Sequence, residues 1–212
     1  MRSFAFSNPG FLALLGGAPT APPVGPAAPA PGYQFFTETA LASSKQQLQL
    51  PGLAGQEVVT VFLVLNKATL TEDLRMAFSI LTAGNFTRTW VGYTGRSYTY
   101  NLGITYNTFV DGFVHLATAT LLDNEKTILL TAEMGRNGVT FYLNGLLQES
   151  ISFRNAQQRL EWSDEVILGG ETNPAYDWQG IIYACYLYFG LLSDAERQAT
   201  EMYLRTRFPS VN

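Results

Sequence analysis

Cysteine and histidine are almost missing from this chain, which removes several classes of chemistry at once. Cys185 is the single cysteine and His115 the single histidine among 212 residues. Cys185 therefore has no partner for an intrachain disulfide, and a structural zinc site would need more Cys or His ligands than the chain has. Neither a Gly-x-Ser-x-Gly elbow nor a phosphate-binding loop occurs. We predict no metal and no cofactor, and expect Cys185 and His115 to be packing or surface residues.

Charge is also scarce, and long apolar runs are lacking. Charged residues make up 14% of the chain, with 13 basic and 17 acidic side chains and a net charge of -4. No run of Lys or Arg is available to neutralise a row of phosphates, so nucleic acid is excluded as a partner. No stretch approaches the roughly 20 apolar residues of a membrane-spanning helix, and residues 1–21 match a signal peptide only weakly.

Proline is concentrated at the N-terminus, which predicts an arm covering residues 1–32. This segment holds seven of the ten prolines, and proline fixes φ and removes backbone donors, so an extended path is expected. Such an arm either packs back onto its own domain or lies across neighbouring subunits of an assembly. The apolar residues expected to anchor it in a partner are Phe4, Phe6, Phe11, Leu12, Leu14 and Leu15.

Residues 33–212 have the pattern of one all-β domain. Val58 to Leu65 is almost wholly apolar, as in a strand covered on both faces, and Thr127 to Met134 alternates, as in a half-buried strand. Asn144 and Gly145 between two β-rich runs predict a hairpin with a two-residue turn. Further strands are expected at residues 75–82, 87–93, 98–103, 114–122, 165–168 and 181–189, and residues 33–57 should hold a first strand and a crossing segment.

One helix is expected at the C-terminus. Ser193 is a good N-cap and Glu196 stands three residues later, which is the pattern of a capping box, and Pro209 should stop the helix. Many strands followed by one helix suggest a sandwich with the helix laid against an edge or rim.

The second half of the domain resembles a known family. The motifs are GVTFYLNG at 138–145, ILGG at 167–170, WQGIIY at 178–183 and LLSDAER at 191–197, in this order. They are similar to those of the concanavalin A-like, laminin-G-like jelly rolls. The resemblance implies a two-sheet antiparallel jelly-roll sandwich with a short C-terminal helix. All of these residues serve turns, close backbone approaches or the helix start, so the resemblance implies a fold more firmly than a function.

Enzymes of that family carry alternating carboxylates on one strand. The nearest match here is Glu161, Asp164 and Glu165, which has the wrong spacing and falls in an expected turn. We therefore predict that the protein is not an enzyme. Calcium binding through the loop 171–177 or the turn 123–125 stays open, although neither has the tight ligand spacing of a dedicated loop, and solvated turns fit better.

The remaining functional signal is aromatic. Core packing, a protein interface and stacking on sugar rings are the three interpretations that we keep for these rings. The candidate glycan or interface aromatics are Trp90, Tyr93, Tyr106, Tyr176 and Trp178.

Three functional hypotheses from different classes follow. The first is a non-enzymatic structural component of a large assembly, most plausibly a phage virion protein such as a capsid decoration, tail or fibre subunit. It would be anchored in other structural proteins by residues 1–32, homo-oligomeric and located in the virion. The alternative is a carbohydrate-binding, lectin-like module, and surface glycans could be partners in both cases. A polysaccharide-cleaving enzyme is the third and least favoured hypothesis, because the carboxylate strand is missing.

Overall fold

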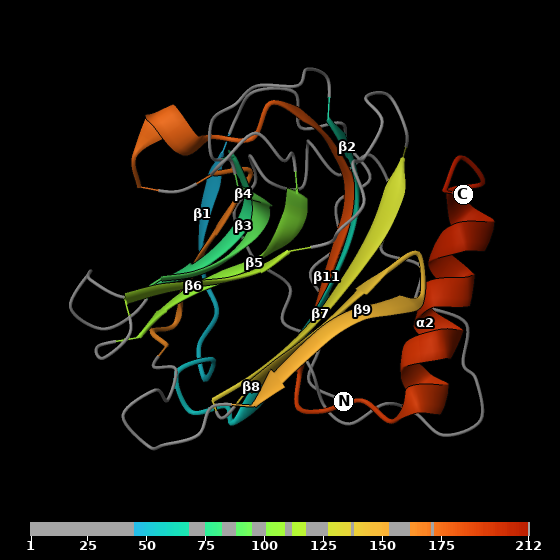
Figure 1. The fold of residues 1–212 in the computed structure, drawn as a ribbon, viewed down its shortest axis with the longest axis horizontal. Helices are drawn as coiled ribbons and strands as arrows, with labels where there is room; N and C mark the ends of the chain where they lie inside the picture. Colours follow the sequence, from blue (N-terminus) through green and yellow to red (C-terminus); the bar gives the residue numbers. More distant parts are fainter. Residues whose placement is uncertain are drawn as a thin grey trace.

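A computed structural model gives the fold of the protein (Figure 1). It describes residues 45–67, 75–81, 88–94, 101–108, 112–117, 127–136, 138–152, 162–170 and 172–211. The strands are β1 (Gln46–Gln49), β2 (Val58–Lys67), β3 (Arg75–Leu81), β4 (Arg88–Thr94), β5 (Asn101–Thr108), β6 (Gly112–Ala117), β7 (Ile128–Gly135), β8 (Gly138–Leu143), β9 (Leu146–Ser152), β10 (Glu165–Leu168) and β11 (Gly180–Phe189). The helices are a 3-10 turn, η2 (Pro174–Tyr176), and α2 (Asp194–Arg207).

The strands form two antiparallel sheets that face each other, with α2 beside one of them (Figure 1). The six-stranded sheet has the order β1-β10-β3-β4-β5-β6, and the five-stranded sheet has the order β11-β2-β7-β8-β9. The ladders between these neighbours are all antiparallel. This is the two-sheet sandwich predicted from the sequence.

The main core lies between the sheets and follows the period-two alternation of the strands. On β2, Val59, Val61, Leu63 and Leu65 are fully buried and belong to this core. Val166 and Leu168 of β10 bring the six-stranded sheet into the same cluster. Each such side chain stabilises the fold by roughly 1.5–3 kcal/mol relative to an exposed position. Cys185 also lies in this core, where burial raises the pKa of its thiol, as expected of a packing residue.

A second apolar cluster lies on the other face of the five-stranded sheet, under α2. Phe62 and Val64 of β2 and Tyr186 of β11 point to this side and pack near Leu204 of the helix. The helix therefore covers an outer sheet face, and the expected position at an edge or rim was wrong. The reason is the continuous apolar run of β2 and β11, which buries side chains on both sheet faces.

The two strongest local predictions are confirmed in detail. Asn144 and Gly145 have φ of 48° and 75°, as a tight hairpin turn between β8 and β9 requires. The Ser193 side chain accepts from the backbone N–H of Glu196, and the Glu196 carboxylate accepts from the N–H of Ser193, which completes the capping box. The Ser193 hydroxyl also donates to the Glu196 carboxylate at 2.6 Å, and this hydrogen bond together with the one from the Ser193 N–H lowers the pKa of Glu196.

Other boundaries differ from the prediction. The strand expected at 98–103 runs from Asn101 to Thr108, and the strand expected at 114–122 starts at Gly112. The first strand expected within residues 33–57 is β1, and Leu50 and Leu53 of the crossing segment that follows are buried in the core. Within the described ranges, no helix has the length and apolar character needed to cross a membrane.

Candidate functional site

The six-stranded sheet has an outer face, turned away from the other sheet, and one row of residues crosses it from edge to edge. Its members alternate with core residues such as Val166 and Leu168, so they belong to the opposite face. The pairing register gives the row as Gln47, Ile167, Ser79, Trp90, Thr105 and His115. The row begins on the edge strand β1, whose sequence QQLQ places Gln47 at an exposed position.

The segment after β10, residues 169–178, folds back onto one end of this sheet. The Ser79 hydroxyl donates to the backbone oxygen of Gly170 at 2.8 Å, and the Arg75 guanidinium donates to the backbone oxygen of Ala175. Asp177 forms an isolated parallel bridge with Met76 of β3. These contacts fix residues 169–178 against the sheet, with η2 beyond β1 in Figure 1.

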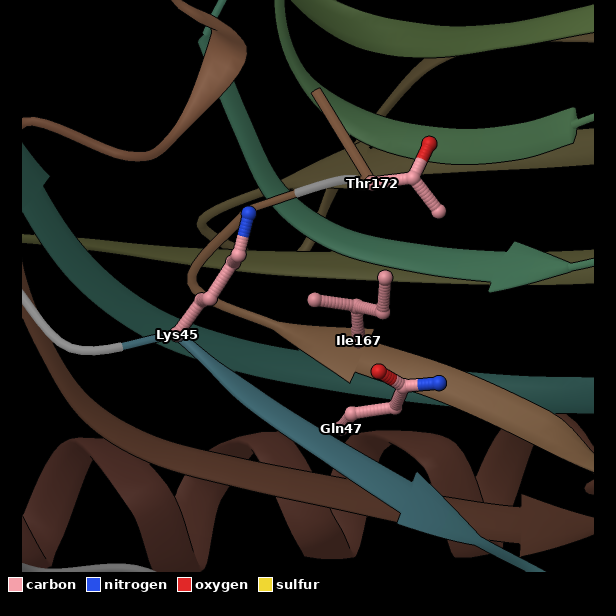
Figure 2. Close-up of a pocket in the computed structure, with 4 residues that line it drawn as sticks. All are labelled: Lys45, Gln47, Ile167 and Thr172. Atoms are coloured by element: carbon pink, nitrogen blue, oxygen red, sulfur yellow. The ribbon is translucent and has the colours of Figure 1, made fainter. Parts of the chain in front are cut away.

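A surface cavity of about 300 Å³ lies where this segment meets β1 and β10. Figure 2 shows its lining: Lys45 and Gln47 come from β1 and the residue before it, Ile167 from β10 and Thr172 from the segment that follows. Lys45, Gln47 and Thr172 are exposed, whereas Ile167 is buried. The cavity therefore combines a buried apolar side chain with exposed ammonium, amide and hydroxyl groups.

An ion pair borders the cavity. Lys45 Nζ lies 3.3 Å from Asp177 Oδ1, and about a third of each side chain is exposed (32% and 33%). The absence of a side chain at Gly170 makes room for this pair, because a Cβ there would lie 2.3 Å from Asp177 Oδ1 and 3.3 Å from Lys45 Cβ. The ion pair therefore depends on glycine at position 170.

The predicted aromatic residues do not form one group. Trp178 is only 4% exposed and packs in the main core, so a glycan or interface role does not fit its burial. Tyr176 is half-buried on η2 and does not line the cavity among the described residues. Trp90 occupies the outer-face row, whereas Tyr93 and Tyr106 occupy alternate register positions, in phase with the buried Val91. The side chains of Trp90, Tyr93 and Tyr106 lie outside the described residues.

The acidic residues considered for catalysis or calcium have structural contacts. The Asp164 carboxylate accepts from the backbone N–H of Ala54 at 2.8 Å and so holds the crossing segment that follows β1. In the loop 171–177, Asp177 pairs with Lys45, and the Asn173 side chain caps η2. The described part of the chain contains no group of three or more His, Cys, Asp or Glu side chains that could hold a metal ion. Glu161, Glu171 and the turn 123–125 lie outside the described residues.

The predicted arm is also outside the described residues, because the description starts at Lys45. The anchoring role of Phe4, Phe6, Phe11, Leu12, Leu14 and Leu15 therefore stays a prediction, as does the division of the chain at residue 32.

Sequence reasoning missed the cavity residues Lys45, Gln47, Ile167 and Thr172. None of them belongs to a motif, and Lys45 and Asp177 are 132 positions apart in the chain. The available signals were local ones, the Gly169-Gly170 pair that allows a close approach and the polar alternation of QQLQ on β1. Neither signal reveals that β1 pairs with β10.

Comparison with known proteins identifies the fold. No protein-family model and no curated protein matches the chain by sequence. CBM40 of the Ruminococcus gnavus IT-sialidase, solved with α2,3-sialyllactose, superposes with a TM-score of 0.58 at 19% identity, over 79% of this chain and 97% of that one. Domain 4 of an extracellular GH43 arabinanase from Geobacillus stearothermophilus, solved with arabinotriose, gives 0.57 at 17% identity, over 82% of each chain.

Domains LG4-5 of the mouse laminin α1 chain give a TM-score of 0.52 at 13% identity, over 76% of this chain and 46% of that one. All three are concanavalin A-like jelly rolls, and the chain shares their fold, as its motifs predicted. At identities this low, the similarity establishes the fold alone.

Proposed function

We propose that this protein is a non-catalytic carbohydrate-binding module, and that it binds a glycan in the cavity between β1, β10 and residues 169–178. The observation that carries the proposal is the lining of that cavity. Three exposed polar side chains, Lys45, Gln47 and Thr172, surround the buried Ile167. Small-molecule sites combine apolar surface with a few placed polar groups in the same way, and about 300 Å³ lies at the lower end of their usual range.

The chemistry of a sugar ring fits this lining. A pyranose has an apolar face of C–H groups and a rim of hydroxyls that both donate and accept hydrogen bonds. Ile167 forms the buried apolar base of the cavity, and the Gln47 amide and Thr172 hydroxyl can each donate to and accept from the hydroxyl rim. The solved structures of the same fold support this proposal, because two of them were determined with oligosaccharides, sialyllactose and arabinotriose.

The arrangement of carboxylates near the cavity favours glycan binding without cleavage of the glycan. A glycosidase of the usual kind needs two carboxyl groups on either side of the scissile bond. None of the described residues that line the cavity carries a carboxylate, and the nearby Asp177 carboxylate is paired with the lining residue Lys45 at 3.3 Å. We therefore expect glycan binding with no release of reducing sugar.

The test is a glycan array followed by calorimetry on the full chain, with variants at the cavity. Gln47→Ala and Thr172→Ala each remove hydrogen-bonding groups from the lining. Each variant is expected to lose about 1.4 kcal/mol of binding free energy, which corresponds to a tenfold weaker affinity for the glycan. The matched controls are Gln198→Ala and Thr206→Ala on α2, which remove the same groups from exposed positions elsewhere. Weaker binding in the cavity variants alone supports the proposal, and a chain that binds no glycan on the array refutes it.

A further inference from the structure

We infer that the cavity selects neutral, hydroxyl-rich sugar units and discriminates against acidic sugars. This inference rests on the proposed function and names the ligand class of the same site. It starts from the Lys45–Asp177 ion pair, in which the two charged atoms are 3.3 Å apart at the border of the cavity. Among the described lining residues, Lys45 is the one that carries positive charge. That charge is already compensated.

An acidic sugar would therefore gain little from Lys45. Its carboxylate would meet an ammonium shared with Asp177, and it would also be repelled by the Asp177 carboxylate a few ångströms further on. Attraction to the ammonium and repulsion by the carboxylate act over similar distances, so the two effects nearly cancel. A like charge beside the binding position is the usual means of rejecting a charged competitor.

Arg75 is a second cation near the site, and its guanidinium is hydrogen-bonded to a backbone carbonyl. Arg75 is buried, and its guanidinium donates to the carbonyl oxygen of Ala175, on the segment that also carries Asp177. Arg75 thereby stabilises the position of residues 169–178. In this arrangement its side chain supports the wall of the site.

The backbone of Asp177 is held by several contacts. The discrimination against acidic sugars is therefore built into the site before a ligand binds. Its backbone N–H donates to Pro174 at the end of η2, and its bridge to Met76 ties it to β3. The neighbouring Gly170 leaves space for the carboxylate, and its backbone oxygen accepts from Ser79. Because the backbone at Asp177 is fixed before a ligand arrives, only the carboxylate end of the side chain has to be ordered on binding.

The same pair is well suited to neutral sugars. The Lys45 ammonium donates hydrogen bonds, and the Asp177 carboxylate accepts them. Adjacent hydroxyls on a sugar ring can use both groups at once, one hydroxyl accepting from the ammonium and its neighbour donating to the carboxylate. Hydrogen bonds to charged groups contribute more than those between neutral groups.

The experiment uses two pairs of probes, measured by calorimetry with the full chain: oligogalactose against oligogalacturonate, in which a carboxylate replaces each CH2OH group, and lactose against 3′-sialyllactose, which carries one additional acidic sugar. We expect the neutral member of at least one pair to bind about tenfold or more tightly than its acidic counterpart. Asp177→Asn should reduce this preference, because it removes the repelling carboxylate and its ion pair with Lys45. Glu57→Gln, the same chemical change at an exposed glutamate on the segment before β2, is the matched control and should leave the preference unchanged.

The outcomes separate the two proposals. Equal or tighter binding of the acidic members overturns the inference and leaves the proposed function standing. An unchanged preference in Asp177→Asn also overturns it, because the discrimination would then come from elsewhere. If the chain binds neither the four probes nor any glycan on the array, the proposed function is refuted and the inference with it.

Discussion

The guanidinium of Arg197 lies directly over the ring of Tyr142, with Arg197 Cζ 3.9 Å from the ring centroid. The two residues come from α2 and β8, so this cation-π contact joins the helix to the outer face of the five-stranded sheet. Arg197 also donates to both carboxylate oxygens of Glu201 at 2.9 and 3.1 Å, and the Thr131 hydroxyl donates to the same carboxylate at 2.9 Å. A buried polar network thus accompanies the apolar cluster under the helix.

Glu201→Gln is expected to destabilise the fold by about 3 kcal/mol. The Arg197 and Glu201 side chains are each only 6% exposed, and removing one partner of a buried ion pair leaves the other charge uncompensated. Asp194 and Glu133 cannot substitute fully, because their carboxylates lie 3.5 and 3.8 Å from Arg197 and the Asp194 side chain is 83% exposed. The measurement is urea unfolding at pH 7, with exposed Glu57→Gln as the control. A loss no larger than that of the control would contradict a structural role for the pair.

Glu133 is expected to make the stability of the fold depend on pH, with a smaller contribution at neutral pH than at acidic pH. Burial raises the pKa of its carboxyl group, and the neighbouring Arg197 offsets only part of this effect. The folded protein therefore binds this proton more tightly than the unfolded chain does, so the contribution of Glu133 to stability falls as pH rises through its ordinary value. Glu133→Gln should remove that loss. Urea unfolding at pH 4 and pH 7 should show the variant gaining stability relative to the parent at pH 7, and a larger deficit at pH 7 than at pH 4 would refute the assignment.

Gly92→Ala should be among the most destabilising single substitutions, by about 3 kcal/mol or more. A Cβ at this position would lie 2.0 Å from the backbone oxygen of Arg75 and 2.9 Å from Met76 Cα, so β3 and β4 would have to separate next to the irregular pairing at Met76 and Phe78. Gly55→Ala is the control, since its nearest atom would be a backbone oxygen at 3.6 Å. The measurement is the thermal or urea unfolding midpoint of each variant, which should be clearly lower for Gly92→Ala than for Gly55→Ala. Similar midpoints would mean that β4 tolerates a side chain at residue 92.

Local signals in the sequence predicted the parts of the fold that local physics determines. Asn144-Gly145 and Ser193 with Glu196 are such cases, because the turn conformation and the cap hydrogen bonds arise within four residues. Trp178 shows the limit of this reasoning. An aromatic residue beside a polar loop looks available for a ligand, but the chain returns to the sandwich at this point and buries the ring in the core.

The candidate site was beyond sequence reasoning for a related reason. It needs the edge strand β1 to pair with β10 and Lys45 to meet Asp177, and both relationships join distant parts of the chain. The motif pattern does predict Gly170, but as a residue of the fold. The assembly role of residues 1–32 stays a prediction, and deletion of this arm followed by an incorporation assay would test it.

Gly170→Ala links the fold to the proposed site and separates binding from stability. A Cβ at residue 170 would lie 2.3 Å from Asp177 Oδ1, so the carboxylate must move, but it is the free end of a side chain and can do so without disturbing the sheet. An ion pair about one third exposed contributes roughly 0.2–1 kcal/mol, so the free energy of unfolding should fall by no more than about 1 kcal/mol. Calorimetry with the neutral sugar selected from the array should nevertheless show about tenfold weaker binding, because the fixed acceptor is displaced and Lys45 loses its partner. Gly55→Ala serves as the control for a glycine with ordinary surroundings. Unchanged affinity in Gly170→Ala, with its unfolding midpoint intact, would place the sugar away from the Lys45–Asp177 pair.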